Sequence, residues 1–274
     1  MSGLPTLISH YWLARHGRHF EDRSALEAWQ DRRVRKAMRW AMAHSSFYSE
    51  RYRGRDLAAW RSFPAIDKAT MMANFDRLNT RGISLEQAMA VALEAERSRD
   101  FAPMIGDLTV GLSSGTSGSR GLFLVSPGER AAWAGTILGK ILPGSILGRH
   151  RIAFFLRANS NLYESVSGRR IRFQFFDLLD PLDRHIERLN AMKPTSLVAP
   201  PSMLRFLAEA KAAGTLTIAP EKIVSVAEVL DPLDEAAIAE AFGQRVHQVY
   251  QCTEGFLAAT CAHGTLHLNE DLVV

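Results

Sequence analysis

The sequence predicts an α/β fold, in which a helical N-terminal region (residues 1–100) is followed by a helix-covered mixed sheet (residues 101–274). The first region carries apolar residues mainly at helical spacing. Beyond it, short apolar runs of strand length alternate with helical stretches, a pattern typical of a largely parallel sheet covered by helices. With 47% hydrophobic residues among 274, the chain can bury a substantial core.

Helix-start signals place the first elements. The helices expected in the N-terminal region cover residues 25–44, 68–75 and 84–96. Ser24 with Glu27, and Ser84 with Gln87, have the spacing of a capping box. Arginines and tryptophans alternate along the first of these helices, as on nucleic-acid-binding surfaces, but we favour the solvated face of an amphipathic helix.

The second region begins with a predicted hairpin, whose strands cover residues 108–110 and 121–126, and a helix that starts at Pro127 and runs through Ile141. The further predicted strands are residues 152–156, 171–176, 196–199, 223–226, 246–250 and 266–268. Predicted helices that separate several of them are residues 183–191, 202–213 and 232–242.

A loop rich in glycine and hydroxyl residues joins the two hairpin strands. It reads Ser113-Ser114-Gly115-Thr116-Ser117-Gly118-Ser119-Arg120-Gly121. Glycine lets backbone N–H groups approach an anion, and the hydroxyls add uncharged donors, so the loop is suited to a polyphosphate. It is not a Walker loop, because no Gly-Lys-Ser/Thr ends it and a β-rich run follows. The alternative is a hairpin turn that binds nothing.

Two further strand ends carry candidate binding residues. After one strand, Tyr250 is suited to stack on a base, Thr253 to donate to a phosphate and Glu254 to hold Mg²⁺, which prefers oxygen ligands. After another, Ala227 and Glu228 again put a small residue and a carboxylate at a strand end. An aromatic strand end that closes in a solvated turn is the alternative for the first.

Together and in this order, the three segments resemble the adenylate-forming superfamily of acyl-CoA synthetases, adenylation domains and luciferases. Its motifs Ser-Gly-Thr-Thr-Gly, Gly-Gly-Glu or Gly-Ala-Glu, and Tyr-Gly-x-Thr-Glu correspond to Ser114 to Gly118, Ala227-Glu228 and Tyr250 to Glu254. The resemblance implies the large N-terminal domain of such an enzyme, with residues 101–274 as its nucleotide-binding region.

The resemblance narrows to the phenylacetate-CoA ligase branch, over residues from about 31 to the end. The segments that carry it are Ser46-Phe47-Tyr48-Ser49-Glu50-Arg51-Tyr52, Phe63-Pro64-Ala65-Ile66-Asp67-Lys68 and His267-Leu268-Asn269-Glu270-Asp271. Within the branch, the chain is most similar to adenylate-forming proteins grouped with coenzyme F-390 synthetase, which transfer AMP to a deazaflavin.

The resemblance implies an AMP-forming ligase that uses ATP and Mg²⁺, with CoA left open as a further cofactor. The implied catalytic residues are Thr116, Thr253, Glu254 and Arg120. The implied nucleotide-binding residues are Ser113, Ser114, Gly115, Thr116, Ser117, Gly118, Ala227, Glu228, Tyr250 and Gln251, with Glu254 as the Mg²⁺ ligand.

Three departures from the family pattern qualify this expectation. Arg120-Gly121 stands where the family has Pro-Lys, so Arg120 is expected to supply the positive charge with a different geometry, and Gln251 replaces the usual glycine. The mobile C-terminal lid domain of the family is not in this sequence, which predicts weak or absent adenylation by the chain alone. A non-catalytic nucleotide-binding remnant, and half of a split enzyme with a separate lid polypeptide, are the alternatives.

Acceptor and metal candidates complete the prediction. Asn161, Tyr163 and Ser202 are expected to line the pocket of a small-molecule acceptor, with a plain helix cap as the alternative for Ser202. The candidate zinc ligands are Cys252, Cys261, His263 and His267, although Cys-x8-Cys is wider than the usual zinc knuckle.

The remaining composition sets the expected environment. Two cysteines make no disulfide framework, and no signal-peptide core or run of about 18 apolar residues is present. We therefore expect a soluble cytoplasmic protein, without nucleic-acid or membrane partners.

Overall fold

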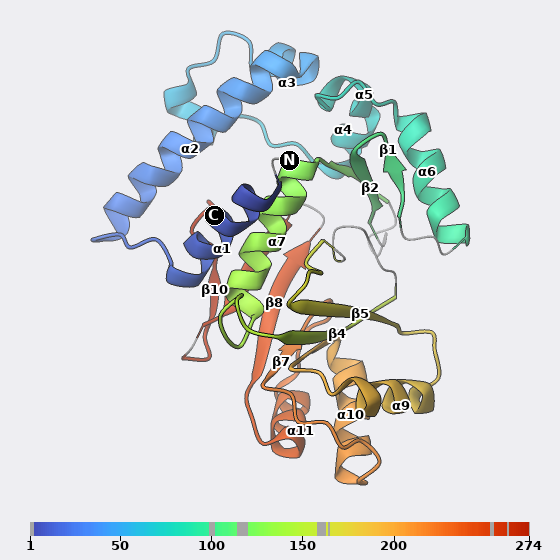
Figure 1. The fold of residues 1–274 in the computed structure, drawn as a ribbon. Helices are drawn as coiled ribbons and strands as arrows, with labels where there is room; N and C mark the ends of the chain where they lie inside the picture. Colours follow the sequence, from blue (N-terminus) through green and yellow to red (C-terminus); the bar gives the residue numbers. More distant parts are fainter. Residues whose placement is uncertain are drawn as a thin grey trace. The chain divides into compact units, whose positions relative to one another are not determined.

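The computed structural model describes residues 3–98, 102–113, 120–157, 163, 165–252, 255–261 and 263–273 (Figure 1). Its contacts divide the chain into two compact units. Unit 1 combines Met1–Gly17 with Ser126–Asn269, and unit 2 combines Arg18–Val125 with Glu270–Val274. Helices precede residue 100 and α/β structure follows it, as expected, but the compact units are composed differently because the chain passes from one unit to the other three times.

Unit 1 is built on a seven-stranded mixed sheet with the order β10-β9-β8-β7-β6-β4-β5. Its strands are β4 (His150–Leu156), β5 (Ile171–Asp177), β6 (Ser196–Ala199), β7 (Lys222–Ser225), β8 (Val246–Cys252), β9 (Gly255–Thr260) and β10 (Leu266–Leu268). Neighbours from β5 to β8 pair in parallel, whereas β8, β9 and β10 pair antiparallel. The predicted mixed sheet is therefore confirmed.

Helices cover both faces of this sheet. Successive residues of a strand point to opposite faces, so one strand contributes to the core on each side. On one face, α9 (Leu182–Met192), α10 (Pro201–Ala212) and α11 (Pro232–Phe242) share a core with Ala153 and Phe155 of β4. On the other face, α1 (Gly3–His16) and α7 (Pro127–Ile141) share a core with Ile152, and Phe154 packs against it. The layered α/β architecture expected from the sequence is thus observed.

Helix α7 begins with a capping box and packs closely against α1. Ser126 and Glu129 form a reciprocal capping box, and Pro127 occupies the first turn. Helix α1 lies alongside α7 (Figure 1). A Cβ atom at Gly139 would come 2.8 Å from the carbonyl oxygen of Tyr11, so the close approach of the two helices requires glycine there.

Unit 2 consists mainly of short helices and a three-stranded antiparallel sheet. Its elements are α2 (Arg23–His44), α3 (Ser46–Arg51), the 3₁₀ helix η1 (Leu57–Ser62), α4 (Lys68–Ala73), α5 (Phe75–Leu78), α6 (Leu85–Ser98), β1 (Met104–Ile105), β2 (Leu108–Leu112) and β3 (Leu122–Val125). Phe75, Ala88, Val110 and Leu122 belong to its core. The predicted hairpin is confirmed as β2 and β3.

Two local predictions for unit 2 are wrong. Asp22, not Ser24, caps α2: its carboxylate accepts a hydrogen bond from the Ala25 N–H at 2.8 Å, and aspartate is itself a strong capping residue. The helix expected over residues 68–75 is two helices that meet at Asn74, where the backbone leaves helical geometry (φ −119°, ψ 17°). The cap at Ser84 is confirmed, because its hydroxyl accepts from the Gln87 N–H at 3.1 Å.

Among the residues that the structure describes, no helix has the combination of length and apolar character that crossing a bilayer requires.

Candidate functional site

The carboxyl ends of the parallel strands in unit 1 bring several predicted residues to one edge of the sheet. Ligands of open α/β sheets bind at this edge, where the loops after the strands converge. Strands β6, β7 and β8 are consecutive neighbours. Ser202 follows β6, Ala227 and Glu228 follow β7, and Tyr250 lies near the end of β8.

Ala227 sits in a strained turn directly after β7. Its φ of 68° is in the left-handed region, which a residue with a Cβ rarely adopts. The Glu228 N–H donates to the Val226 carbonyl at 2.9 Å, which closes a three-residue turn around Ala227. Such strain costs about 1–3 kcal/mol and is concentrated at functional sites.

Glu228 is committed to the start of α10. Its carboxylate accepts from the Ser202 hydroxyl at 3.1 Å and from the Ser202 N–H at 3.3 Å. The first N–H groups of a helix have no partner within it, and the helix dipole favours a negative charge there. The cap position of α10 is Pro200, without a side-chain cap bond, so the alternative reading of Ser202 as the N-cap is wrong.

Tyr250 lies near the end of β8, the strand next to β7. Ser225, the last residue of β7, is opposite Gln248 of β8, and Tyr250 lies two residues beyond Gln248. Ala227 and Tyr250 therefore belong to the same ends of two strands that run about 4.8 Å apart. Tyr250 is 54% exposed, which leaves the phenol ring accessible for stacking.

Gln251 contacts an aromatic cluster on the α7 face of the sheet. The register of β8 against β9 shifts between Tyr250 and Gln251, and the Gln251 side-chain oxygen accepts from the Trp133 indole N–H at 3.3 Å. The Tyr163 ring is 5.7 Å from that of Trp133 and 4.8 Å from that of Phe154. Burial raises the pKa of the Tyr163 phenol, so it stays protonated at neutral pH.

In unit 2, Ser113 closes the base of the glycine- and hydroxyl-rich loop. Its N–H donates to the Gly121 carbonyl at 2.8 Å, and its hydroxyl accepts from the Gly121 N–H at 2.7 Å. Ser113 is 8% exposed. Its observed contacts are those of a hairpin clamp, and the phosphate contact expected from the sequence stays a prediction.

Arg120 is held by other protein groups beside this clamp. Its guanidinium donates to both carboxylate oxygens of Glu96, with one distance of 2.7 Å, and to the Ser113 carbonyl at 3.1 Å. The hydrogen bond with Glu96 raises the pKa of Arg120 further. The positive charge expected to face phosphates is therefore paired with a carboxylate in this structure.

Several predicted residues lie outside the described part of the chain. They are Ser114, Gly115, Thr116, Ser117, Gly118, Asn161, Thr253 and Glu254. The group includes most of the expected phosphate contacts and the expected Mg²⁺ ligand.

The four candidate zinc ligands are not brought together. Within the described residues, no group of three or more histidine, cysteine or acidic side chains is placed to hold a metal. Cys252 pairs with Gly255 where β9 begins, whereas Cys261 follows the end of β9. Cys261 lies six positions after Gly255 along β9, a distance of about 20 Å. His267, on β10, is opposite Ala259 of β9, and His263 lies in the turn between these two strands.

Three residues that the sequence interpretation missed belong to these groups. Trp133 and Phe154 were assigned only to a helix and a strand, yet they form the aromatic cluster with Tyr163. Glu96 pairs with Arg120 across 24 positions. No local signal in the sequence points to this pair, because the two residues meet only through tertiary packing.

A surface depression of unit 2 contains none of the predicted residues. It has a volume of about 490 Å³, is widely open, and is lined by Thr80, Arg81, Ile83, Ile105, Gly106, Asp107 and Leu108. Its lining residues come from the loops around β1, far in sequence from the strand ends of unit 1. We assign it no role.

Comparison with known proteins identifies the fold. No model of a protein family matches the chain, and no curated protein matches it either. Among solved structures, 2-hydroxyisobutyryl-CoA ligase in complex with 2-HIB-AMP and CoA, in the thioesterification state, is 17% identical with a TM-score of 0.62. The similarity covers 89% of this chain and 53% of the ligase chain.

The same ligase in an open conformation, also with 2-HIB-AMP and CoA, is 16% identical with a TM-score of 0.58, covering 84% of this chain and 51% of that chain. The chain therefore spans about half the length of the ligase structures it matches. At this identity the likeness establishes the fold. The chain has the α/β fold of an N-terminal domain of adenylate-forming ligases, as the sequence predicts.

Proposed function

We propose that this chain is the nucleotide-binding core of an ATP-dependent, AMP-forming ligase. Its substrate would be a small-molecule carboxylate, or the phenolic hydroxyl of a deazaflavin, which it would activate as an AMP adduct. One observation supports this most directly: the exposed Tyr250 ring and the strained Ala227 turn both lie at the carboxyl edge of the sheet, at the ends of adjacent strands. The chain shares its fold with a ligase that was solved with 2-HIB-AMP.

The adenine would lie between the Tyr250 ring and the backbone around Ala227. Every base has a π-face, and stacking on an aromatic ring contributes about 1–3 kcal/mol. A methyl side chain in a tight turn lets a flat ring approach the backbone, where a larger side chain would obstruct it. Glu228 would hold this turn in place through its two contacts with Ser202 at the start of α10.

The acceptor would lie against the aromatic cluster formed by Trp133, Phe154 and Tyr163. Such a wall favours an aromatic or apolar acceptor, because binding would remove apolar surface from water on both sides. Gln251 would fix the orientation of the Trp133 indole through their hydrogen bond. Asn161 and Ser202 remain proposed contacts of the acceptor.

In the proposed reaction, an oxygen of the acceptor attacks the α-phosphorus of ATP. The bond between this phosphorus and the bridging oxygen to the β-phosphate breaks, so that pyrophosphate leaves with the electron pair and the AMP adduct remains. Residues 113–118, with Thr116 and Thr253 as hydroxyl donors, are proposed to bind the phosphates. Mg²⁺, with Glu254 as its proposed ligand, would neutralise phosphate charge. CoA is the proposed second substrate, since the ligase of the same fold was solved with it.

The proposal is tested by ATP–pyrophosphate exchange, with a panel of aromatic and aliphatic acids and a deazaflavin as acceptors. We expect exchange that depends on the added acceptor. Thr116→Ala and Glu254→Ala should abolish it, while Asp107→Asn, which alters a surface ion pair of unit 2, should leave it unchanged. Exchange that persists in both Thr116→Ala and Glu254→Ala would refute the assignment.

The paired state of Arg120 favours a second candidate, a non-catalytic nucleotide-binding protein. Glu96 occupies the guanidinium that the reaction would need for the phosphates. In this case the chain would bind ATP, but exchange would be absent with every acceptor. Glu96→Gln distinguishes the two, because releasing Arg120 should raise the exchange rate only in an enzyme.

A further inference from the structure

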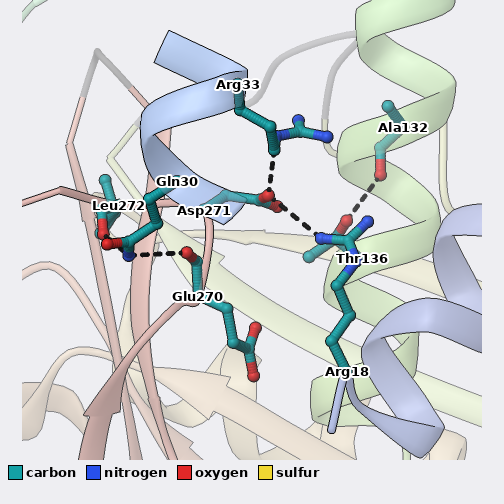
Figure 2. Close-up of polar contacts among 8 residues, drawn as sticks. All are labelled: Arg18, Gln30, Arg33, Ala132, Thr136, Glu270, Asp271 and Leu272. Carbon is teal, nitrogen blue, oxygen red and sulfur yellow. Dashed lines mark hydrogen bonds and ion pairs between the residues drawn. The ribbon is translucent and has the colours of Figure 1, made fainter. Parts of the chain in front are cut away.

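Two of the three places where the chain passes between the units lie next to each other in unit 2. The chain enters unit 2 at Arg18, after α1, and again at Glu270, after β10. The Arg18 guanidinium donates to the Asp271 carboxylate at 3.1 Å, so these two entering segments are joined directly (Figure 2).

Helix α2 supplies the groups that surround this junction. Arg33 pairs with the same carboxylate of Asp271 at 3.4 Å, as Figure 2 shows. The guanidinium carbons of Arg18 and Arg33 lie 4.6 Å and 5.0 Å from the centre of the Trp29 ring. The ring of Phe20, in the first entering segment, lies 5.5 Å from that of Trp29. Both arginines are therefore held in place by one aromatic ring as well as by one carboxylate.

Gln30 binds the backbone of the second entering segment. Its side-chain amide donates to the Glu270 carbonyl at 2.9 Å and to the Leu272 carbonyl at 2.6 Å (Figure 2). Gln30 is 8% exposed, and it is one of the few buried polar side chains in unit 2. A buried amide needs partners for its donors, so its position requires these carbonyls.

The same segment is also fixed on its unit 1 side. The Asn269 N–H donates to the Leu257 carbonyl at 2.8 Å, and its side-chain amide donates to the Phe256 carbonyl at 2.6 Å. The peptide between Asn269 and Glu270, where the chain passes between the units, thus has hydrogen-bonded residues on either side. The first entering segment follows Gly17, whose φ of 73° needs a residue without a Cβ.

We propose that Arg18, Gln30, Arg33 and Asp271 form a clasp that makes these two connections act as one hinge. Two independent connections could each bend separately, whereas two connections joined at their entry into unit 2 must bend together. An exposed ion pair alone adds little to stability. The clasp is therefore expected to affect how the two connections move more than how stable the fold is. This proposal does not depend on the reaction proposed above.

The test measures the distance between the units with paired spin labels. Labels are attached at Glu86→Cys in α6 and Glu187→Cys in α9, both exposed, in a Cys252→Ser, Cys261→Ser background. The two clasp variants are Gln30→Met, which removes both donors at similar volume, and Asp271→Asn, which removes the charge. Asp107→Asn is the matched control, because its ion pair with Arg81 at 3.4 Å lies elsewhere in unit 2.

We expect the distance distribution to become at least twofold wider in both clasp variants and to stay unchanged in Asp107→Asn. A distribution of unchanged width in folded Asp271→Asn, together with unchanged hydrogen exchange of residues 269–273, would overturn the proposal. Asp271 is exposed, so its replacement should keep the fold even if Gln30→Met does not. Equal widening in the control would also overturn it, because the effect would then not be specific to the clasp.

Discussion

Lys222 offers a prediction whose sign and size both follow from the structure. It lies at the start of β7, at the opposite edge of the sheet from the Ala227 turn. Its ammonium donates to the Lys140 carbonyl at 3.0 Å, near the C-terminal end of α7, and Arg15 donates to the Leu142 carbonyl at 2.9 Å. Burial, and secondly the charge of Arg15, lower the pKa of Lys222 from 10.5 to about 8.

The lowered pKa means that the folded protein binds this proton less tightly than the unfolded chain does. Between pH 8 and 10.5 the unfolded state carries more protons, so the contribution of Lys222 to stability rises with pH across that window. The full shift corresponds to about 3 kcal/mol, and solvent screening of the partly buried ammonium reduces the cost at neutral pH to about 1–2 kcal/mol. Lys222→Met removes this cost, while it loses one hydrogen bond of about 1 kcal/mol.

Urea denaturation at pH 7, 8, 9 and 10.5, for the wild type and Lys222→Met, measures the difference directly. We expect the variant to be as stable as the wild type or up to about 1 kcal/mol more stable at pH 7. This advantage should fall steadily above pH 8 and end as a deficit of about 1 kcal/mol at pH 10.5. Other groups that titrate cancel in the comparison. A difference that does not change with pH would refute the reasoning.

Two other substitutions test single features. Ala227→Gly should raise the free energy of unfolding by about 1 kcal/mol in urea denaturation, because relief of the left-handed strain exceeds the entropy cost of glycine; a clear loss of stability would contradict this. His185 is fully buried, and burial lowers its pKa. The wild type should therefore lose stability as the pH falls below about 6.5. His185→Leu should weaken this loss, seen as a smaller drop in Tm between pH 7.5 and 5, and an unchanged drop would count against it.

Much of the fold could be predicted because local signals agreed with the tertiary structure. The strands at residues 196–199 and 266–268 and the helix at residues 232–242 have the predicted bounds. Helix α1 and strand β9 were not predicted. Leu4, Ile8 and Trp12 of α1 are exposed, so its apolar pattern does not mark a buried face, and β9 is mostly half-buried with no clear alternation.

The candidate site could be predicted at its strand ends and not beyond them. The rule that neighbouring parallel strands end at one edge places Ser202, Glu228 and Tyr250 at that edge, and Ser202 and Glu228 are hydrogen-bonded to each other there. The partners of Arg120 and Gln251 could not be found this way, because Glu96 and Trp133 lie 24 and 118 positions away in the chain. Pairing over such separations depends on tertiary packing, which no local pattern encodes.

The central claim is that the carboxyl edge of the unit 1 sheet, with Tyr250 at its face, binds ATP. A calorimetric titration with Mg-ATP tests it most directly, using the wild type, Tyr250→Ala, and Thr116→Ala for the loop. We expect saturable binding by the wild type, an affinity about 5- to 150-fold weaker in Tyr250→Ala from the loss of about 1–3 kcal/mol of stacking, and loss of binding in Thr116→Ala. The absence of binding in folded wild-type protein, or an undiminished affinity in Tyr250→Ala, would contradict the claim.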